Sequence, residues 1–156
     1  MQKKIKATKT FNAFAFRSQE GDFFMPKPAK LVLADGTAFT GMAPDWQTTN
    51  TIGEVVFNTG MTGYVESLTD PSYSGQILTF TYPLIGNYGV DVRAAESGKI
   101  QVSGVIVSEA ATGWSHVGAD RSLLEWLQSQ NIPVLMGVDT RALTKHLRSG
   151  GAQAGA

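Results

Sequence analysis

The sequence predicts a mixed α/β fold built around a layered sheet, and three observations support this prediction. Short β-rich runs bounded by glycine or proline occupy the chain from residue 30 to residue 107. After residue 118 the hydrophobic residues recur with helical spacing, and strand-like and helical segments then alternate. Strands first, followed by strand, helix, strand and helix, is an order typical of sheet and helix layers that share one core.

The β-rich runs predict a hairpin followed by three further strands. Asp35-Gly36 lies between two such runs, 30–34 and 37–40, and this dipeptide favours a type I′ turn, in which both central residues have positive φ. We expect a polar loop over 41–52 and a turn-rich connection over 83–89. The three further predicted strands, the first of them buried, are 54–58, 76–82 and 102–107.

Helix signals are clearest in the last third of the chain. A short helical turn is expected over 65–69, where Asp70-Pro71 ends it. Ser122 and Glu125 have the spacing of a capping box at the start of a helix. A strand over 132–138 follows. Asp139-Thr140 then caps a second helix that carries Leu143 and Leu147 and ends at Gly150-Gly151.

Length and charge restrict the class of protein. A chain of 156 residues fits one domain and can bury a core without disulfides. Basic and acidic residues number 13 each, and this balance argues against nucleic-acid binding through bulk charge. The longest apolar stretches, such as 102–107, are too short to span a membrane. We therefore expect neither a nucleic-acid partner nor a membrane partner.

The two ends of the chain are expected to lie outside the domain at 29–150. Residues 1–28 predict a flexible basic extension, because lysines precede the first acid, Glu20, and Pro26 and Pro28 close the stretch. No continuous apolar region suits a secretory signal, so we expect a cytoplasmic protein, with organelle targeting by the basic arm as the alternative. Residues 151–156 are rich in glycine and alanine and predict the start of a linker.

Catalytic constellations are scarce. The absence of cysteine excludes thiolate metal sites and a cysteine nucleophile. His116 and His146 are the only histidines, and neither has metal-ligand spacing, so we predict no catalytic residue and no metal ligand. Two loops, 58–64 and 69–76, combine glycine, hydroxyls and an aromatic residue. The small side chains in these loops would let the backbone approach a ligand or partner closely. The alternative is that both loops are ordinary connections between strands and helices.

Several long motifs occur along the chain: LADGTAF at 33–39, GEVVFNTGMTGY at 53–64, LTDPSYSGQI at 68–77, TYPLIGNYG at 81–89 and VDTRALT at 138–144. Together they resemble the small subunit of glutamine-dependent carbamoyl phosphate synthase, over roughly residues 29–155. The resemblance implies an N-terminal domain with a three-layer β/β/α swivelling-type fold. It also implies that a class I glutamine amidotransferase domain, missing here, follows the linker.

The resemblance further implies a role for the whole protein. The small subunit hydrolyses L-glutamine and passes ammonia to a large subunit, which uses ATP, magnesium and bicarbonate to make carbamoyl phosphate for arginine and pyrimidine biosynthesis. The catalytic Cys-His-Glu set belongs to the amidotransferase domain. This chain alone is therefore expected to be inactive, to hold no cofactor, and to dock the glutaminase against the large subunit.

Three residues acquire roles from this resemblance. Ser72, in the Asp-Pro-Ser-Tyr motif, is implied to contact glutamine, and Gly60 and Met61 match positions near the ammonia route. One alternative is a stand-alone binding or scaffold module on the same fold. A self-sufficient hydrolase that uses Ser72 or Ser74 is disfavoured, because no base has a recognisable relation to either serine.

Overall fold

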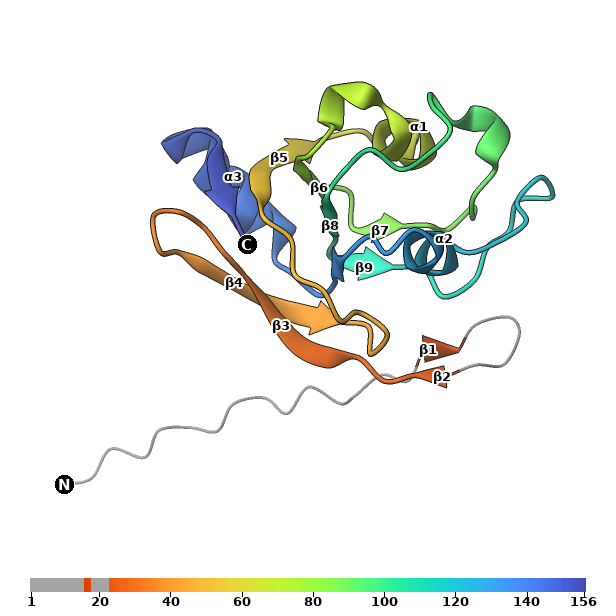
Figure 1. Ribbon diagram of the computed structural model, residues 1–156, viewed down its shortest axis with the longest axis horizontal. Coiled ribbons are helices and arrows are strands. Elements are labelled where there is room, and N and C mark those ends of the chain that lie inside the picture. Colours follow the sequence, from red (N-terminus) through yellow and green to blue (C-terminus); the bar gives the residue numbers. More distant parts are fainter. Residues whose placement is uncertain (1–15, 18–22) are drawn as a thin grey trace.

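The computed structural model describes residues 16–17 and 23–156 (Figure 1). Its helices are α1 (Tyr64–Thr69), α2 (Leu123–Ser129) and α3 (Thr140–Gly150), with short 3₁₀ turns η1 (Pro71–Tyr73) and η2 (Val92–Ala94). Its strands are β1 (Phe16–Arg17), β2 (Phe23–Phe24), β3 (Lys27–Val32), β4 (Ala38–Ala43), β5 (Gly53–Asn58), β6 (Ile77–Phe80), β7 (Leu84–Ile85), β8 (Gly104–Ile106), β9 (Glu109–Ala110), β10 (Val134–Leu135) and β11 (Gln153–Gly155).

A five-stranded sheet in the order β10-β8-β6-β5-β11 forms the centre of the molecule. The strands β5, β6, β8 and β10 run parallel, and β11 runs antiparallel to β5 at the edge. Their carboxyl ends therefore share one edge of the sheet, and the loops that follow them meet there. This edge positions the pocket described below.

The β3–β4 hairpin is hydrogen-bonded to both edge strands of the central sheet. On one side Val32 exchanges two backbone bonds of 2.9 and 3.0 Å with Ala156, next to β11. On the other side Met42 and Met136 exchange two bonds of 2.8 Å beside β10. The hairpin thus covers edges that would otherwise expose unpaired backbone groups. Gly41 permits the close approach, because a Cβ there would lie 2.4 Å from the Met136 carbonyl oxygen.

Both faces of the central sheet are buried. Leu78 and Val105 belong to one apolar cluster, which packs the sheet against α1 and α2. Their neighbours Ile77 and Ile106 point to the opposite face and join a second cluster with the hairpin and α3. Figure 1 shows the hairpin on one side of the sheet and α1 and α2 on the other. The predicted α/β class is confirmed, and the swivelling-type topology stays a prediction.

The two longer helices begin as the sequence predicts. Ser122 and Glu125 form both hydrogen bonds of a capping box before α2. The Asp139 carboxylate caps α3 by accepting a 2.9 Å bond from the Ala142 N–H. Gly151, at φ 80°, ends α3. The buried stripe of α3 follows the helical period and consists of Thr140, Leu143, Thr144 and Leu147.

The predicted hairpin is confirmed, but its turn type was wrong. Only Gly36 has a positive φ, 86°, whereas a type I′ turn requires two such residues. The Gly36 N–H donates to the Leu33 carbonyl, and the Leu33 N–H donates to the Thr37 carbonyl. This pattern is a type I turn followed by a glycine bulge. The expected loop 41–52 was also too long, because β4 continues to Ala43.

The chain ends differ from the sequence-based boundaries. Residues 151–156 are not a linker in the structure, because β11 pairs with β5 there and Ala156 bonds to Val32. Of the predicted extension 1–28, residues 27–28 belong to β3, and residues 1–15 and 18–22 lie outside the described part. In the strand predicted as buried over 54–58, only Val55 is fully buried. No helix in the described ranges combines the length and the apolar character of a membrane span.

Candidate functional site

Ser72 lies exposed in the single turn η1 that follows α1. Asp70 caps this turn, and its carboxylate accepts a 2.8 Å hydrogen bond from the Ser72 N–H. The pKa of Asp70 lies below its ordinary value, because hydrogen bonds from Ser72 stabilise the ionised carboxylate. The Ser72 N–H has the larger effect and the Ser72 hydroxyl the smaller one. Pro71 at the first position fixes the entry to the turn. Ser72, the residue predicted to contact glutamine, therefore lies on a short segment that these hydrogen bonds hold in place.

Gly60 and Met61 lie in the connection between β5 and α1. The Gly60 N–H donates a 2.7 Å bond to the Asn58 side-chain oxygen. The Gly63 N–H donates a 2.8 Å bond to the Tyr88 hydroxyl, and Gly63 has the positive φ of 82° that the turn into α1 requires. Met61 between these anchors is 69% exposed. An unbranched apolar side chain presented to solvent on a fixed loop suits contact with another protein surface.

Asn58 joins the two loops that the sequence singles out. Its side-chain amide donates to the Ser67 hydroxyl at 3.0 Å and to the Tyr73 hydroxyl at 3.4 Å. Its backbone carbonyl accepts from the Thr81 N–H at 3.1 Å. The loop that carries Met61 and the turn that carries Ser72 are therefore tied through one residue. Neither Met61 nor Ser72 lines the pocket described next.

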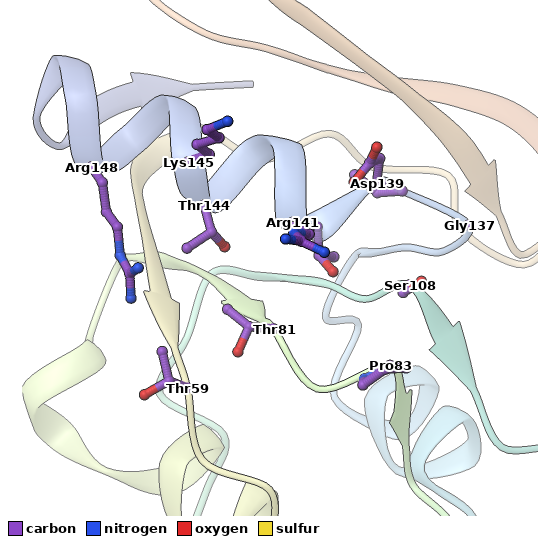
Figure 2. A pocket seen from close by; sticks show the side chains of 12 residues that line it. Thr59, Thr81, Pro83, Ser108, Gly137, Asp139, Arg141, Thr144, Lys145 and Arg148 are labelled. Carbon is purple, nitrogen blue, oxygen red and sulfur yellow. The ribbon is translucent and has the colours of Figure 1, made fainter.

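A pocket of about 640 Å³ lies between α3 and the carboxyl ends of the parallel strands, and we call it the α3 pocket. Thr59 follows β5, Thr81 follows β6, and Ser108 follows β8, so three hydroxyl residues come from three adjacent strand ends. Figure 2 shows Thr144 and Arg148 extending from α3 toward this edge. The full lining is Thr59, Thr81, Pro83, Ser108, Gly137, Val138, Asp139, Thr140, Arg141, Thr144, Lys145 and Arg148.

Positive charge dominates the α3 pocket. Arg141, Lys145 and Arg148 stand three and four residues apart along α3, and Asp139 is the single acid in the lining. Within the described ranges no carboxylate lies within 4.0 Å of these three cations. The Arg148 guanidinium lies 5.3 Å from the centroid of the Phe57 ring, an attractive contact that holds the side chain over β5. The geometry favours a negatively charged ligand.

One polar group at the α3 pocket lacks a hydrogen-bond partner. Thr144 is 7% exposed, and its hydroxyl oxygen has no donor or acceptor within reach. Thr79, on β6, is fully buried, and its hydroxyl also has no hydrogen-bond partner. A buried hydroxyl without a partner costs free energy, and native structures contain few of them.

Both histidines serve as hydrogen-bonding residues. The His146 Nε2 lies 2.7 Å from an Asp35 carboxylate oxygen, and this contact joins α3 to the hairpin turn. The Thr37 N–H contributes most to lowering the pKa of Asp35, ahead of His146. The His116 Nδ1 accepts a 3.1 Å bond from the Gly118 N–H. In the parts of the chain that the structure covers, no three His, Asp or Glu side chains form a metal-binding group.

Sequence reasoning missed the α3 pocket because its lining comes from four separate segments of the chain. The spacing of Arg141, Lys145 and Arg148 could have signalled a cationic side of α3. Nothing in the linear pattern places Thr59, Thr81 or the end of β8 opposite that side.

A family model and individual related proteins point to the same protein family. Residues 31–156 match the model of the carbamoyl-phosphate synthase small chain, CPSase domain. The carbamoyl phosphate synthase small chain of Synechococcus sp. is 58% identical over 127 residues, which are 81% of this chain and 32% of that protein. The arginine-specific small chain of Bacillus subtilis is 55% identical over 121 residues, which are 78% of this chain and 34% of that protein.

A longer protein contains a related segment. The multifunctional protein URA2 of Saccharomyces cerevisiae is 47% identical over 137 residues, which are 80% of this chain and 6% of that protein. The chain spans about a third of the length of the small chains that it matches.

Proposed function

The chain belongs to the carbamoyl phosphate synthase small-chain family, and we propose that it is the N-terminal domain of the small subunit of a glutamine-dependent carbamoyl phosphate synthase. The match over residues 31–156 is the main support. In this proposal the complete small subunit hydrolyses glutamine in a class I amidotransferase domain and passes ammonia to a large subunit. There ATP, magnesium and bicarbonate yield carbamoyl phosphate.

The present domain docks the glutaminase against the large subunit and has no hydrolytic activity alone. The chain contains no cysteine, whereas amide hydrolysis of this type needs a thiolate nucleophile. The exposed Met61 supports a docking role. The domain holds no cofactor of its own in this proposal, and the enzyme is cytoplasmic. One relative is named arginine-specific, which favours arginine biosynthesis as a destination of the product, with pyrimidine biosynthesis as the other.

Ser72 assists glutamine binding rather than chemistry. A neutral hydrogen bond contributes about 0.5–1.5 kcal/mol, and one to a charged group contributes up to about 3 kcal/mol. Such a contact changes affinity by up to roughly a hundredfold. Its exposed position on a capped turn lets it reach a ligand held by a neighbouring domain. Gly60 and Met61 line the start of the ammonia route in the same proposal.

Substitution of Ser72 tests the glutamine contact. In the complete small subunit paired with its large subunit, Ser72→Ala is expected to raise the KM for glutamine about tenfold, because one hydrogen bond is lost. Ammonia-dependent synthesis stays unchanged. The matched control is Ser74→Ala, which removes an exposed hydroxyl two residues away. An equal loss of both activities, or an equal effect of Ser74→Ala, would contradict a direct contact.

Substitution of Met61 tests docking. The 156-residue chain is expected to capture the large subunit in a pull-down, and Met61→Glu is expected to weaken capture at least tenfold by placing a charge in an apolar contact. Val117→Glu is the control, since Val117 is fully exposed elsewhere on the surface. Unchanged capture by Met61→Glu argues against this interface. Release of ammonia from glutamine by the pure chain argues against the inactive-domain assignment.

A further inference from the structure

The α3 pocket has no part in the proposed function. Its net positive charge favours the binding of a negatively charged ligand. The lining carries three positive charges and one negative charge. Asp139 is already engaged, because its carboxylate caps α3 through the Ala142 N–H. Arg141 and Lys145 stand one turn apart on one side of the helix, where like charges repel each other. A ligand with two negative charges balances this arrangement.

The hydroxyl groups of the α3 pocket supply donors to match. Thr59, Thr81 and Ser108 present side-chain oxygens from three strand ends, and all three line the same pocket. The Thr81 hydroxyl already donates its proton to the Asn58 carbonyl at 3.2 Å. The Thr59 and Ser108 hydroxyls make no hydrogen bond among the described residues, so their protons are free to be donated to a ligand. Hydroxyls and guanidinium groups that converge on one space suit a group with three or more acceptor oxygens.

The buried Thr144 hydroxyl is an independent sign of an absent partner. It occupies a position in the apolar stripe of α3, where an aliphatic residue would pack without cost. Its oxygen has no partner, and the residue is 93% buried with its side chain directed from α3 toward Thr81 (Figure 2). A threonine here gains from its hydroxyl only if something in the pocket bonds to it.

The size of the α3 pocket indicates more than a lone inorganic ion. A volume of about 640 Å³ falls within the range of about 300–1,000 Å³ that small-molecule sites occupy. The exposed Pro83 adds apolar surface beside the charged groups. Its position outside the carboxyl ends of parallel strands is where α/β sheets commonly bind ligands.

From these observations we propose that the α3 pocket binds a small molecule that carries a phosphate group. A phosphate monoester brings nearly two negative charges and three acceptor oxygens near neutral pH, whereas a carboxylate brings one charge and two oxygens. Arg148, held over the Phe57 ring, and Arg141, at the opposite end of the cationic row, bind the phosphate group together with the Thr59 and Ser108 hydroxyls. The site is independent of the glutaminase assignment, because it uses neither Ser72 nor Met61.

Calorimetric titration of the full 156-residue chain tests this site. The probes are inorganic phosphate, pyrophosphate and glycerol 3-phosphate, with sodium acetate as the carboxylate probe, all at one ionic strength fixed with sodium chloride. We expect saturable binding of one equivalent of each phosphate probe and at least tenfold weaker binding of acetate. Equal affinity for acetate would overturn the phosphate assignment, and the absence of saturable binding of every phosphate probe would overturn the site.

Charge variants locate the binding. Arg148→Gln and Arg141→Gln are each expected to weaken glycerol 3-phosphate binding at least tenfold, the loss of one charge-assisted hydrogen bond. Two variants are used because Arg148 also contacts Phe57, whereas Arg141 is exposed and has no such structural role. Lys99→Gln removes an exposed positive charge outside the pocket lining and is expected to bind as the parent chain does. Equal weakening in all three variants indicates general charge attraction and contradicts the site.

Thr144→Val separates a ligand contact from a structural role. The substitution keeps the shape of the side chain and removes a hydroxyl that has no partner in the chain. We expect glycerol 3-phosphate binding to weaken severalfold while the melting temperature of the free chain stays equal or rises. Unchanged binding, or a lower melting temperature without weaker binding, would contradict the role assigned to this hydroxyl.

Discussion

The segment around α1 and the α3 pocket are neighbours, since Thr59 directly follows Asn58, yet they satisfy their buried polar groups differently. Around α1, the fully buried Thr69 hydroxyl donates to the Val65 carbonyl at 2.8 Å and accepts from the Glu96 N–H at 2.9 Å. At the other side of the sheet, the hydroxyls of Thr79 and Thr144 have no partner. Buried polar groups with complete hydrogen bonding rigidify a region, and incomplete ones destabilise it.

This difference indicates two uses of polar residues in one small domain. The α1 segment uses them to hold the loops that carry Met61 and Ser72 in fixed positions. In the α3 pocket the buried Thr144 hydroxyl has no hydrogen-bond partner, and Arg141, Lys145 and Arg148 have no ion-pair partner among the described residues. We expect complete hydrogen bonding where a loop presents a fixed surface to another protein. We expect polar groups without partners where a small ligand supplies the missing hydrogen bonds.

The largest loss of stability is expected from removing the Asn58 side chain, which links the loops around α1. Asn58→Ala removes bonds to the Gly60 N–H, the Ser67 hydroxyl and the Tyr73 hydroxyl. At about 0.5–1.5 kcal/mol for each bond, we expect a loss of about 3 kcal/mol in the free energy of unfolding. Urea denaturation measures this loss as a lower midpoint with an unchanged slope.

Two companion variants sharpen the result for Asn58. Asn50→Ala alters an exposed asparagine and is expected to cost less than about 0.5 kcal/mol. Asn58→Asp is expected to be milder than Asn58→Ala, because a carboxylate still accepts from Gly60 and the two hydroxyls can donate to it. If Asn58→Ala costs no more than Asn50→Ala, the loops are not organised through this residue.

A smaller, pH-dependent effect is expected at Tyr64 in the same region. Its buried hydroxyl donates to the Gly89 carbonyl, and burial raises the pKa of Tyr64 above its ordinary value of about 10. The unfolded chain therefore loses this proton first as the pH rises. The stability contributed by Tyr64 is fully present below about pH 10 and declines above it.

Comparison with Tyr64→Phe measures this contribution. We expect the variant to be about 1 kcal/mol less stable at pH 8, because the Gly89 carbonyl loses its partner. The difference between the parent chain and the variant should then shrink above pH 10 in urea titrations. A difference that stays constant from pH 8 to pH 11 would show that Tyr64 ionises equally in both states.

Local signals predicted the helices well. The capping box at Ser122 and Glu125, and the cap at Asp139 with its glycine stop at Gly151, depend on residues within one or two turns of one another. The Asp35-Gly36 dipeptide likewise predicted a hairpin, although it did not predict the turn type, in which only Gly36 has a positive φ.

Long-range pairing was beyond prediction from the sequence. Residues 153–155, Gln-Ala-Gly, have little strand propensity, and they form β11 only because β5 and the hairpin present unpaired backbone groups on either side. The two-residue strands β7 and β9 arise in the same way. For the site, a contiguous motif pointed to Ser72, whereas the α3 pocket exists only once separate strand ends meet α3.

The sharpest contrast is expected from one substitution made on both sides of the central sheet, and of all the variants the one at Thr79 should lower stability least. Thr69→Val removes a hydroxyl that the Val65 and Glu66 carbonyls share as acceptors and that accepts from the Glu96 N–H. It should cost about 2 kcal/mol, within the usual 1–3 kcal/mol for buried polar groups left without a partner. Thr79→Val removes a hydroxyl with no partner, so the free energy of unfolding should stay unchanged or rise by up to about 1 kcal/mol. Both threonines are fully buried and both valines keep the side-chain shape, so burial and volume are matched. If Thr79→Val proves as costly as Thr69→Val, a buried water or another group bonds to Thr79, and the contrast between the two regions disappears.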